Sequence, residues 1–435
     1  MSESARHPTG EPHTLLTPLL NIIPSQSEHV YPSRANAFID RKDLLHDIDT
    51  SGPLSRSTLK AICAISFRFL DSADNSHSDG GSQAFTLAKE VMANIMVDIQ
   101  EFSEARLATI LLMAQHEHES GRYGSSWMLI PMAVRMAFTL RLNLELDDSY
   151  SWKYRETRRR LMWATFCLDK MTFGGISEFS SIETRRMKID LPSPNHNFEN
   201  DVPVPGRTLG EVQSAADTSS NSQINRDGLV SRYIRLTDIR SDVLSYTKNL
   251  SENASLAWEQ DSPFQLCFQR LQQWQDSLPP HLIFSLSNLQ HGQDNVIALF
   301  YLHIFYHQIH CDLYRMTLPG FRESASPEYL ARAPVGWVHR TRDACYLHAV
   351  EITKKISFMA EHFDNFIPND SVLIIFVYEC IRNQIQYIKI TYPGGPSRED
   401  HQLVSTGFEM IMDVAGRTVN YFGRIWRAVS PNSKL

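Results

Sequence analysis

The stretch that decides the fold, GRYGSSWMLIPMAVRMAFTLRLNLE (Gly121–Glu145), opens on two glycines and a pair of serines and then runs almost wholly apolar. A phosphate-binding loop needs a lysine directly after its second glycine, but Ser125 follows Gly124 here. A membrane-spanning helix would place Arg135 and Arg141 near the middle of the bilayer, where a charge is costly. Both alternatives are disfavoured, and the stretch predicts a helix inside a folded protein.

The apolar residues of this stretch are spaced as on a helix that offers few faces to water. Pro131 interrupts the run and is expected to kink the helix or to mark a break in its first turn. We therefore expect a helix that is buried on most sides. One predicted apolar stripe comprises Trp127, Ile130, Val134, Ala137 and Phe138, and the opposite side comprises Met128, Met132, Thr139 and Leu142.

Helical spacing also dominates the rest of the chain. Segments such as SEARLATILLMAQHEHES and DNVIALFYLHIFYHQIHCDLYR repeat apolar residues every three to four positions, whereas alternating β-branched residues are scarce. The run SVLIIFV resembles a strand only until its helical continuation, YECIRNQIQYIKI, is included. The sequence predicts an all-α fold, a large helical domain of many helices packed in an irregular array.

Local composition divides the chain into four parts. Residues 1–33 are rich in proline, serine and histidine and are predicted to form a flexible lead-in. Residues 201–228 are polar, aperiodic and contain glycine, proline and serine, which predicts an exposed linker. This linker separates a first helical half, residues 34–200, from a second helical half of the same domain, residues 229–435.

Overall composition excludes several classes of function. The chain has 435 residues, of which 42% are hydrophobic, so it can bury a large core. Its 49 acidic and 42 basic residues give a net charge of -7, which disfavours DNA binding by this chain alone, because cations that neutralise phosphates hold a duplex. The closest two of the six cysteines, Cys311 and Cys345, are too far apart in sequence for a C-x-x-C motif. The cysteines are predicted to be buried, reduced thiols.

One helical face carries three histidines that resemble a metal site. His303, His307 and His310 stand at positions i, i+4 and i+7, with Cys311 next to them. A zinc hydrolase of the His-Glu-x-x-His type needs a glutamate where Ile304 stands, so the general base is missing. The pattern predicts half-buried histidines that are hydrogen-bonded within the protein.

Two further polar groups receive a similar interpretation. His116, Glu117 and His118 fall at a helix end, where adjacent side chains diverge, and they predict a solvated terminus. The run Arg158–Arg160, with Glu156 nearby, predicts a solvated face at the start of a helix. We assign no catalytic residue, no cofactor-binding residue and no metal ligand.

Two lone charges require partners, because an unpaired buried charge costs several kcal/mol. Arg135 and Asp169 each lie inside an apolar run, and we expect them to form an ion pair. The alternative is that each finds a helix end or another charge nearby. Trp127 and Trp163 lie on the apolar parts of the same two helices and are predicted to be core residues.

Four stretches in this order resemble the fungal-specific transcription factor domain, the middle homology region that follows the binuclear zinc cluster of fungal regulators. They are GRYGSSWMLIPMAVRMAFTLRLNLE, ETRRRLMWATFCLDKMTFGG, MKIDLPSPNHNFEND and HCDLYRMTLPGFRES. The similarity covers about residues 34–425 and departs from the family pattern at Pro131 and at Met162, which replaces the first of two tryptophans. The matching motif residues include Trp127, Arg135, Trp163 and Asp169.

The resemblance implies a regulatory domain that controls transcription in the nucleus, often of a metabolic or secondary-metabolite gene cluster. It implies control through protein partners, either the transcription machinery or a DNA-binding cofactor, with a homo- or heterodimer as one form, or through a small-molecule effector bound among the helices. No membrane is expected, because the sequence has no stretch of eighteen apolar residues. DNA is expected to be reached only indirectly or through a missing N-terminal zinc cluster, since the chain has no C-x2-C-x6-C stretch. The alternatives are a DNA-free co-regulator of a complete zinc-cluster factor and a helical metal-dependent enzyme that uses His303, His307 and His310.

Overall fold

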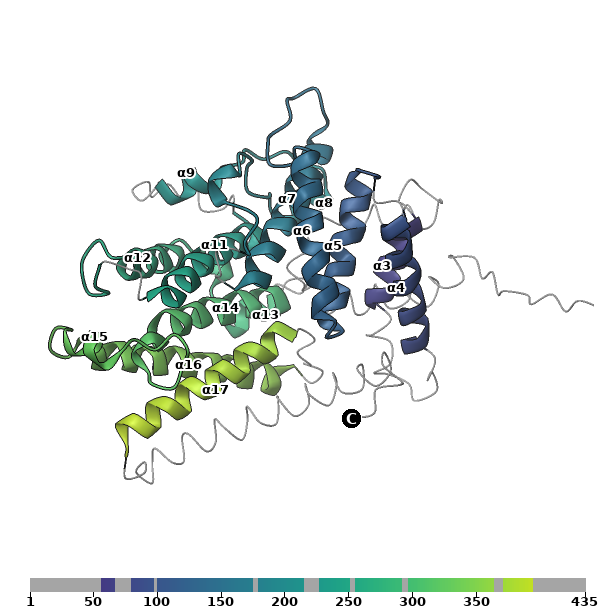
Figure 1. Ribbon diagram of the computed structural model, residues 1–435. Helices are drawn as coiled ribbons and strands as arrows, with labels where there is room; N and C mark the ends of the chain where they lie inside the picture. Colours follow the sequence, from purple (N-terminus) through teal and green to yellow (C-terminus); the bar gives the residue numbers. More distant parts are fainter. Residues whose placement is uncertain are drawn as a thin grey trace, which may run out of the picture.

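The computed structural model describes eight stretches of the chain: residues 56–66, 80–97, 100–174, 179–214, 227–250, 255–291, 296–363 and 371–393. The regular structure in these stretches is helical, and the only β-type pairing is two isolated bridges. The predicted all-α fold is therefore confirmed (Figure 1). The predicted lead-in at residues 1–33 lies outside these stretches.

The first group of helices surrounds α5. Helix α5 packs against α3 on one side and α6 on the other, α4 packs on α3, and α7 packs on α6 (Figure 1). Apolar side chains from these helices form one end of the core, which includes Leu107, Leu111 and Phe166. The five helices are α3 (Arg56–Ser66), α4 (Gly80–Val97), α5 (Glu104–Glu119), α6 (Tyr123–Thr139) and α7 (Trp152–Phe173).

The second group of helices is built around α14 (Val296–Tyr314), in which almost every residue from Leu299 onward is buried. Helices α11 and α16 pack on α14, and α17 packs on α16 (Figure 1). The run SVLIIFV begins α17 and is not a strand. Besides α14, the described helices of this group are α11 (Leu229–Lys248), α12 (Pro263–Asp276), α13 (Leu286–His291), α15 (Pro327–Ala331), α16 (Trp337–His362) and α17 (Ser371–Thr391).

Helix α11 joins the two groups, because it contacts α7 in the first and α14 in the second. The described residues between α7 and α11 include the short helices α8 (Asn195–Glu199) and α9 (Leu209–Ser214) and a single 3-10 turn, η2 (Thr184–Arg186). The division of the chain at residues 201–228 stays a prediction. Within the described residues, no helix combines the length and the apolar composition that crossing a bilayer requires.

Local sequence signals explain where several helices begin and end. The side chains of Ser103, Ser151 and Ser262 each accept a hydrogen bond from a backbone N–H of the first turn of α5, α7 and α12 respectively. Such a cap satisfies one of the orphan donors at a helix N-terminus. Helix α7 ends at Phe173 and is capped by Gly174, whose φ of 53° lies in the left-handed region that glycine adopts readily.

The central helix α6 is less buried than its sequence predicts. Leu129, Ile130 and Ala133 are buried against the neighbouring helices, but Trp127 is 41% exposed and Met128 is 74% exposed. Helices α5 and α7 pack on α6, but Tyr123 and Arg135 are also exposed. The prediction of a helix buried on most sides is therefore wrong, and so is the prediction that Trp127 is a core residue.

Trp163 behaves as predicted. Its side chain is 1% exposed, and its indole N–H donates a hydrogen bond to the backbone carbonyl of Asp190 at 2.7 Å.

The six cysteines are also buried and free, as predicted. Burial raises the pKa of Cys63 and of Cys267 to about 12, so these thiols stay protonated at neutral pH.

Candidate functional site

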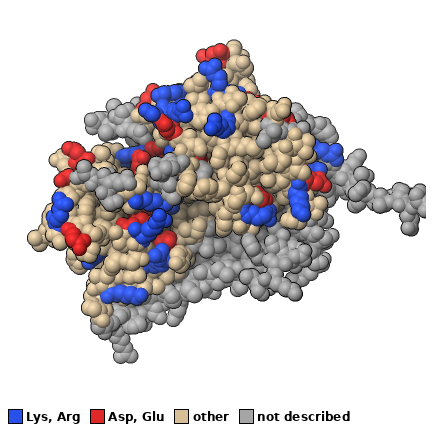
Figure 2. Space-filling view, viewed as in Figure 1, with Lys and Arg blue, Asp and Glu red and all other residues tan. Residues whose placement is uncertain are grey.

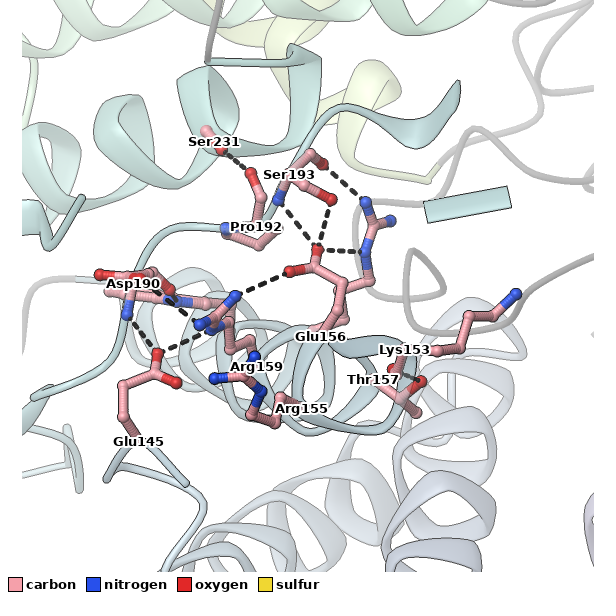
Figure 3. Close-up of polar contacts among 12 residues, drawn as sticks. Glu145, Lys153, Arg155, Glu156, Thr157, Arg159, Asp190, Pro192, Ser193 and Ser231 are labelled. Carbon is pink, nitrogen blue, oxygen red and sulfur yellow. Dashed lines mark hydrogen bonds and ion pairs between the residues drawn. The ribbon is translucent and has the colours of Figure 1, made fainter. Parts of the chain in front are cut away.

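A buried network of charges joins α7 to the segment that follows it. Glu156 lies on the second turn of α7 and is completely buried. Its carboxylate accepts hydrogen bonds from Arg160 Nε at 2.8 Å and from the backbone N–H and the hydroxyl of Ser193 at 2.8 and 2.9 Å. Arg159 Nη1 lies 3.4 Å from the second carboxylate oxygen. Figure 3 shows Glu156 between Arg159 and Ser193.

Arg160 holds the same segment by a second set of contacts. Its guanidinium donates to the backbone carbonyl of Ser193 at 2.7 Å and to the side-chain oxygen of Asn195 at 3.0 Å. Its Cζ atom lies 4.2 Å from the centroid of the Phe198 ring, a cation–π contact. The start of α11 contributes a further bond, from the Ser231 hydroxyl to the carbonyl of Pro192.

Arg159 links α7 to the loop that follows α6. Its Nε lies 2.7 Å from Glu145, and its Nη2 lies 3.4 Å from Asp190. The same Glu145 oxygen accepts the backbone N–H of Asp190 at 2.8 Å. Desolvation opposes the charge on Arg159, but the hydrogen bond with Glu145 and the nearby carboxylates outweigh it and raise the pKa of this arginine.

The three arginines therefore do not form the solvated face that the sequence predicts. The side chains of Arg158, Arg159 and Arg160 are only 11, 10 and 2% exposed. Arg158 forms an ion pair with Glu104 and donates to the carbonyl of Leu140 at 2.8 Å. The prediction fails because the carboxylates and carbonyls that cover these side chains come mainly from other parts of the chain.

A small hollow borders the network, and it is too small for a metabolite. Its free volume is about 10 Å³, roughly the space of one water molecule. The network is therefore suited to joining segments of the protein rather than to holding a substrate. The hollow is lined by Glu156, Arg159, Leu191, Pro192, Ser193, Val204, Pro205, Gly206, Arg207 and Asp227.

The predicted ion pair between Arg135 and Asp169 does not form. Arg135 lies on the exposed side of α6. Asp169 is buried, and it accepts hydrogen bonds from the backbone N–H groups of Ser181 and Ile182 and from the hydroxyl of Ser180. Burial raises the pKa of Asp169, although these donors oppose the shift. The prediction fails because loop donors, which sequence spacing does not reveal, satisfy the carboxylate.

The histidine-rich end of α5 is also more buried than predicted. His116 is 3% exposed and Glu117 is 4% exposed, so a solvated terminus is wrong. Glu117 binds the guanidinium of Arg122 through both carboxylate oxygens, at 2.8 and 2.6 Å. The Gly-Arg turn that opens the central stretch thus supplies Arg122 as the partner of a buried carboxylate.

The histidines of α14 are hydrogen-bonded, as predicted, but His303 and His310 are buried rather than half-buried, and a fourth histidine joins the group. His303 Nε2 lies 2.8 Å from the Leu282 carbonyl oxygen, and His310 Nδ1 lies 3.1 Å from the Tyr314 hydroxyl. His307 Nδ1 lies 2.9 Å from Nδ1 of His348 on α16, and the ring of His348 stacks on that of His310. Within the described stretches, no group of three His, Cys, Asp or Glu side chains is placed to hold a metal ion.

These buried histidines predict a pH-dependent stability. Burial lowers the pKa of His303 and of His348 from 6.5 to about 4. Between these pH values the unfolded chain binds protons that the folded chain excludes, so the free energy of unfolding falls as the pH is lowered. We expect a loss of about 2 kcal/mol for each ring between pH 7 and pH 5, measured by urea denaturation. An unchanged pH dependence in the His348→Gln variant would contradict this assignment.

Sequence reasoning missed four residues that complete these two clusters: Glu145, Asp190, Ser193 and His348. Asp190 and Ser193 belong to the Leu-Pro stretch, Glu145 ends the central stretch and Glu156 begins the ETRRR stretch, so three of the four family motifs meet at the network. The membership of Glu145, Asp190 and Ser193 in these family motifs was the sequence signal that could have identified them. No signal in the sequence pointed to His348, which lies on a different helix from the other three histidines.

The fold and the network together place this protein in the class of helical domains in which buried ion pairs and hydrogen bonds hold separate segments of the chain together. The profile of the fungal specific transcription factor domain matches residues 34–276, more than half of the chain. The chain belongs to this family, which confirms the resemblance of its motifs.

The relatives of the chain are transcriptional regulators. It is 25% identical to an uncharacterised transcriptional regulatory protein of Schizosaccharomyces pombe, over 70% of this chain and 49% of that protein. It is 30% identical to a Zn(2)-C6 fungal-type transcription factor of Fusarium oxysporum f. sp. lycopersici, over 42% of this chain and 22% of that protein. The chain thus spans half or less of the length of these relatives. No solved structure matches it.

Proposed function

We propose that the chain regulates transcription in the nucleus through contacts with other proteins, without catalysis and without reading DNA itself. The support for regulation is the family and the names of its relatives. The proposal places DNA recognition in a partner or in a zinc cluster outside this sequence. Its partners are the transcription machinery or a DNA-binding cofactor, with which the chain forms a heterodimer, or a second copy of the chain.

The single observation that carries the proposal is the burial of the densest basic run. Arg158, Arg159 and Arg160 would be the natural phosphate contacts, but each is bound to carboxylates. A protein holds a duplex mainly by placing accessible cations against its phosphates. Because the net charge of the chain is -7, it has no general excess of cations that could bind DNA in place of these three arginines, which form ion pairs within the protein.

We expect the purified chain to bind promoter DNA only weakly, with strong salt sensitivity and no preference for sequence. The measurement is a fluorescence anisotropy titration of the chain on labelled duplexes at physiological salt, with a scrambled duplex as the control. Saturable, sequence-selective binding at nanomolar concentration would contradict the proposal, because it would require a DNA-reading element in this chain.

Recruitment to DNA by a heterologous domain tests the regulatory part of the proposal. The full chain is fused to an unrelated DNA-binding domain in a fungal cell that carries a matching reporter gene. We expect the fusion to change reporter transcription, whereas the DNA-binding domain alone does not. A well-expressed nuclear fusion that leaves the reporter unchanged would overturn the proposal.

The proposal extends to metabolic or secondary-metabolite genes as targets and to a small-molecule effector bound among the helices. Transcript profiles with and without the gene test the targets.

The rival candidate, a metal-dependent enzyme, has less support, because His303, His307 and His310 contact a carbonyl, another histidine and a tyrosine. Metal analysis of the purified chain separates the two candidates, since stoichiometric zinc or iron would favour the enzyme.

A further inference from the structure

The outer face of α6 exposes a group of large apolar side chains. Tyr123 is 56% exposed, Trp127 is 41% exposed and Met128 is 74% exposed. Phe179, which is 42% exposed, packs edge-on against Trp127 with 4.9 Å between ring centroids. Uncharged side chains cover much of the area over α5 and α6 in the view of Figure 2. Exposed apolar residues that gather in this way mark interaction sites more often than scattered ones do.

The same face becomes cationic toward the C-terminal end of α6. Arg135 follows Met128 by two helical turns and lies on the same side of the helix. Arg141 and Lys188 are exposed beyond that end, and the backbone N–H of Lys188 donates to the carbonyl of Asn143 at 2.9 Å. That bond holds the two cationic segments together.

These cations differ from Arg122 and Arg158 because no carboxylate in the described part of the chain neutralises them. Neither Arg135, Arg141 nor Lys188 forms an ion pair with a described residue, whereas Arg122 and Arg158 each bind a glutamate. An area of free positive charge on a chain with a net charge of -7 attracts an acidic partner. The apolar end and the cationic end together require a ligand that is both acidic and hydrophobic.

We propose that the outer face of α6, formed by Tyr123, Trp127, Met128, Phe179, Arg135 and Arg141, binds an acidic amphipathic helix of a partner protein. The apolar side of that helix packs on the aromatic and methionine side chains, and its carboxylates meet the arginines. Helix α6 rises about 18 Å from Trp127 to its last residue, Thr139, and Arg141 follows just beyond it, so a partner helix of about 14 residues spans this face. This inference rests on the proposed function, in which the chain acts through protein contacts.

A second copy of the chain fits this face less well. In an antiparallel pair of α6 helices, the arginines of each copy would lie over the apolar end of the other, and α6 itself carries no carboxylate to meet them. In a parallel pair, the cations of the two copies would lie side by side and repel each other. An acidic partner helix removes both difficulties.

The binding experiment uses the full chain and a fluorescein-labelled 18-residue helical peptide with leucine and phenylalanine on one side and aspartate and glutamate on the other. We expect the peptide to bind and its affinity to fall with salt. Two control peptides, one with lysine for each acidic residue and one with serine for each apolar residue, should each bind at least about tenfold more weakly than the acidic peptide. Equal binding of the acidic and the lysine peptides would overturn the proposal.

Two variants of the chain locate the binding face. Trp127→Ala and Arg141→Gly should each weaken binding of the acidic peptide about fivefold or more. Arg141 has a φ of 56°, which glycine adopts without strain, so Arg141→Gly should not lower the unfolding midpoint. The matched control is Leu347→Ala, because Leu347 is 60% exposed on α16, away from this face.

Three results would count against the inference: no binding of the acidic peptide, unchanged affinity in both variants, or dimerisation of the chain that the same variants abolish. The last result would assign the face to a second copy. If the peptide fails to bind while the reporter fusion still changes transcription, the inference is wrong and the proposed function stands. If the reporter is unchanged, the proposed function itself fails.

Discussion

The Glu156→Ala variant is expected to lose about 3 to 5 kcal/mol of unfolding free energy, the usual cost of removing one partner from a buried ion pair. The glutamate is completely buried, and Arg160, its closest cationic partner, is 2% exposed. Without the carboxylate, the guanidinium of Arg160 loses its ion-pair partner, and the N–H and hydroxyl of Ser193 lose their acceptor. Urea denaturation followed by circular dichroism measures the loss.

Two further variants distinguish the effect of removing a buried charge from the effect of removing a charge in general. Glu361→Ala removes an exposed glutamate from α16 and should change the unfolding free energy by less than about 0.5 kcal/mol. The double variant Glu156→Leu with Arg160→Met removes both charges and should be more stable than Glu156→Ala. If Glu156→Ala proves as stable as Glu361→Ala, the network contributes nothing to stability and its assignment is wrong.

The second large effect is expected at Trp163, and its contrast with Trp127 makes it a sharp test. Trp163→Ala should cost about 3 to 5 kcal/mol, because the indole is 1% exposed and packed among core residues. Trp127→Ala should cost about 1 kcal/mol or less, because this side chain is 41% exposed. The two unfolding free energies are compared under identical conditions.

A conservative variant distinguishes the packing of Trp163 from its hydrogen bond. Trp163→Phe keeps most of the ring but removes the N–H that donates to Asp190, and it should cost about 1 to 2 kcal/mol. Acrylamide should quench the fluorescence of Trp127 in the folded protein and spare that of Trp163. Equal losses from Trp127→Ala and Trp163→Ala would contradict the burial of these two residues.

The helical class and the helix positions were predictable, because the signals that determine them are local. Apolar spacing predicted α5, α14 and α17, and the serine caps of α5 and α7 lie directly before their first turns. The candidate site was predictable only in part. The run Arg158–Arg160 is visible in the sequence as a cluster of charge, but the prediction that these side chains form a solvated face is wrong.

The sequence by itself determined that this chain is an all-α member of the fungal specific transcription factor domain family, since helical periodicity and motif order are properties of the linear chain. Only the tertiary structure decided that Trp163 is buried while Trp127 faces outward, because a residue on an apolar helix is covered only where a neighbouring helix packs. It also decided that Arg159 meets Glu145 and Asp190. Glu145 precedes α7 and Asp190 follows it, so these partners meet Arg159 only when both flanking segments fold over the helix, and no spacing in the sequence encodes those contacts.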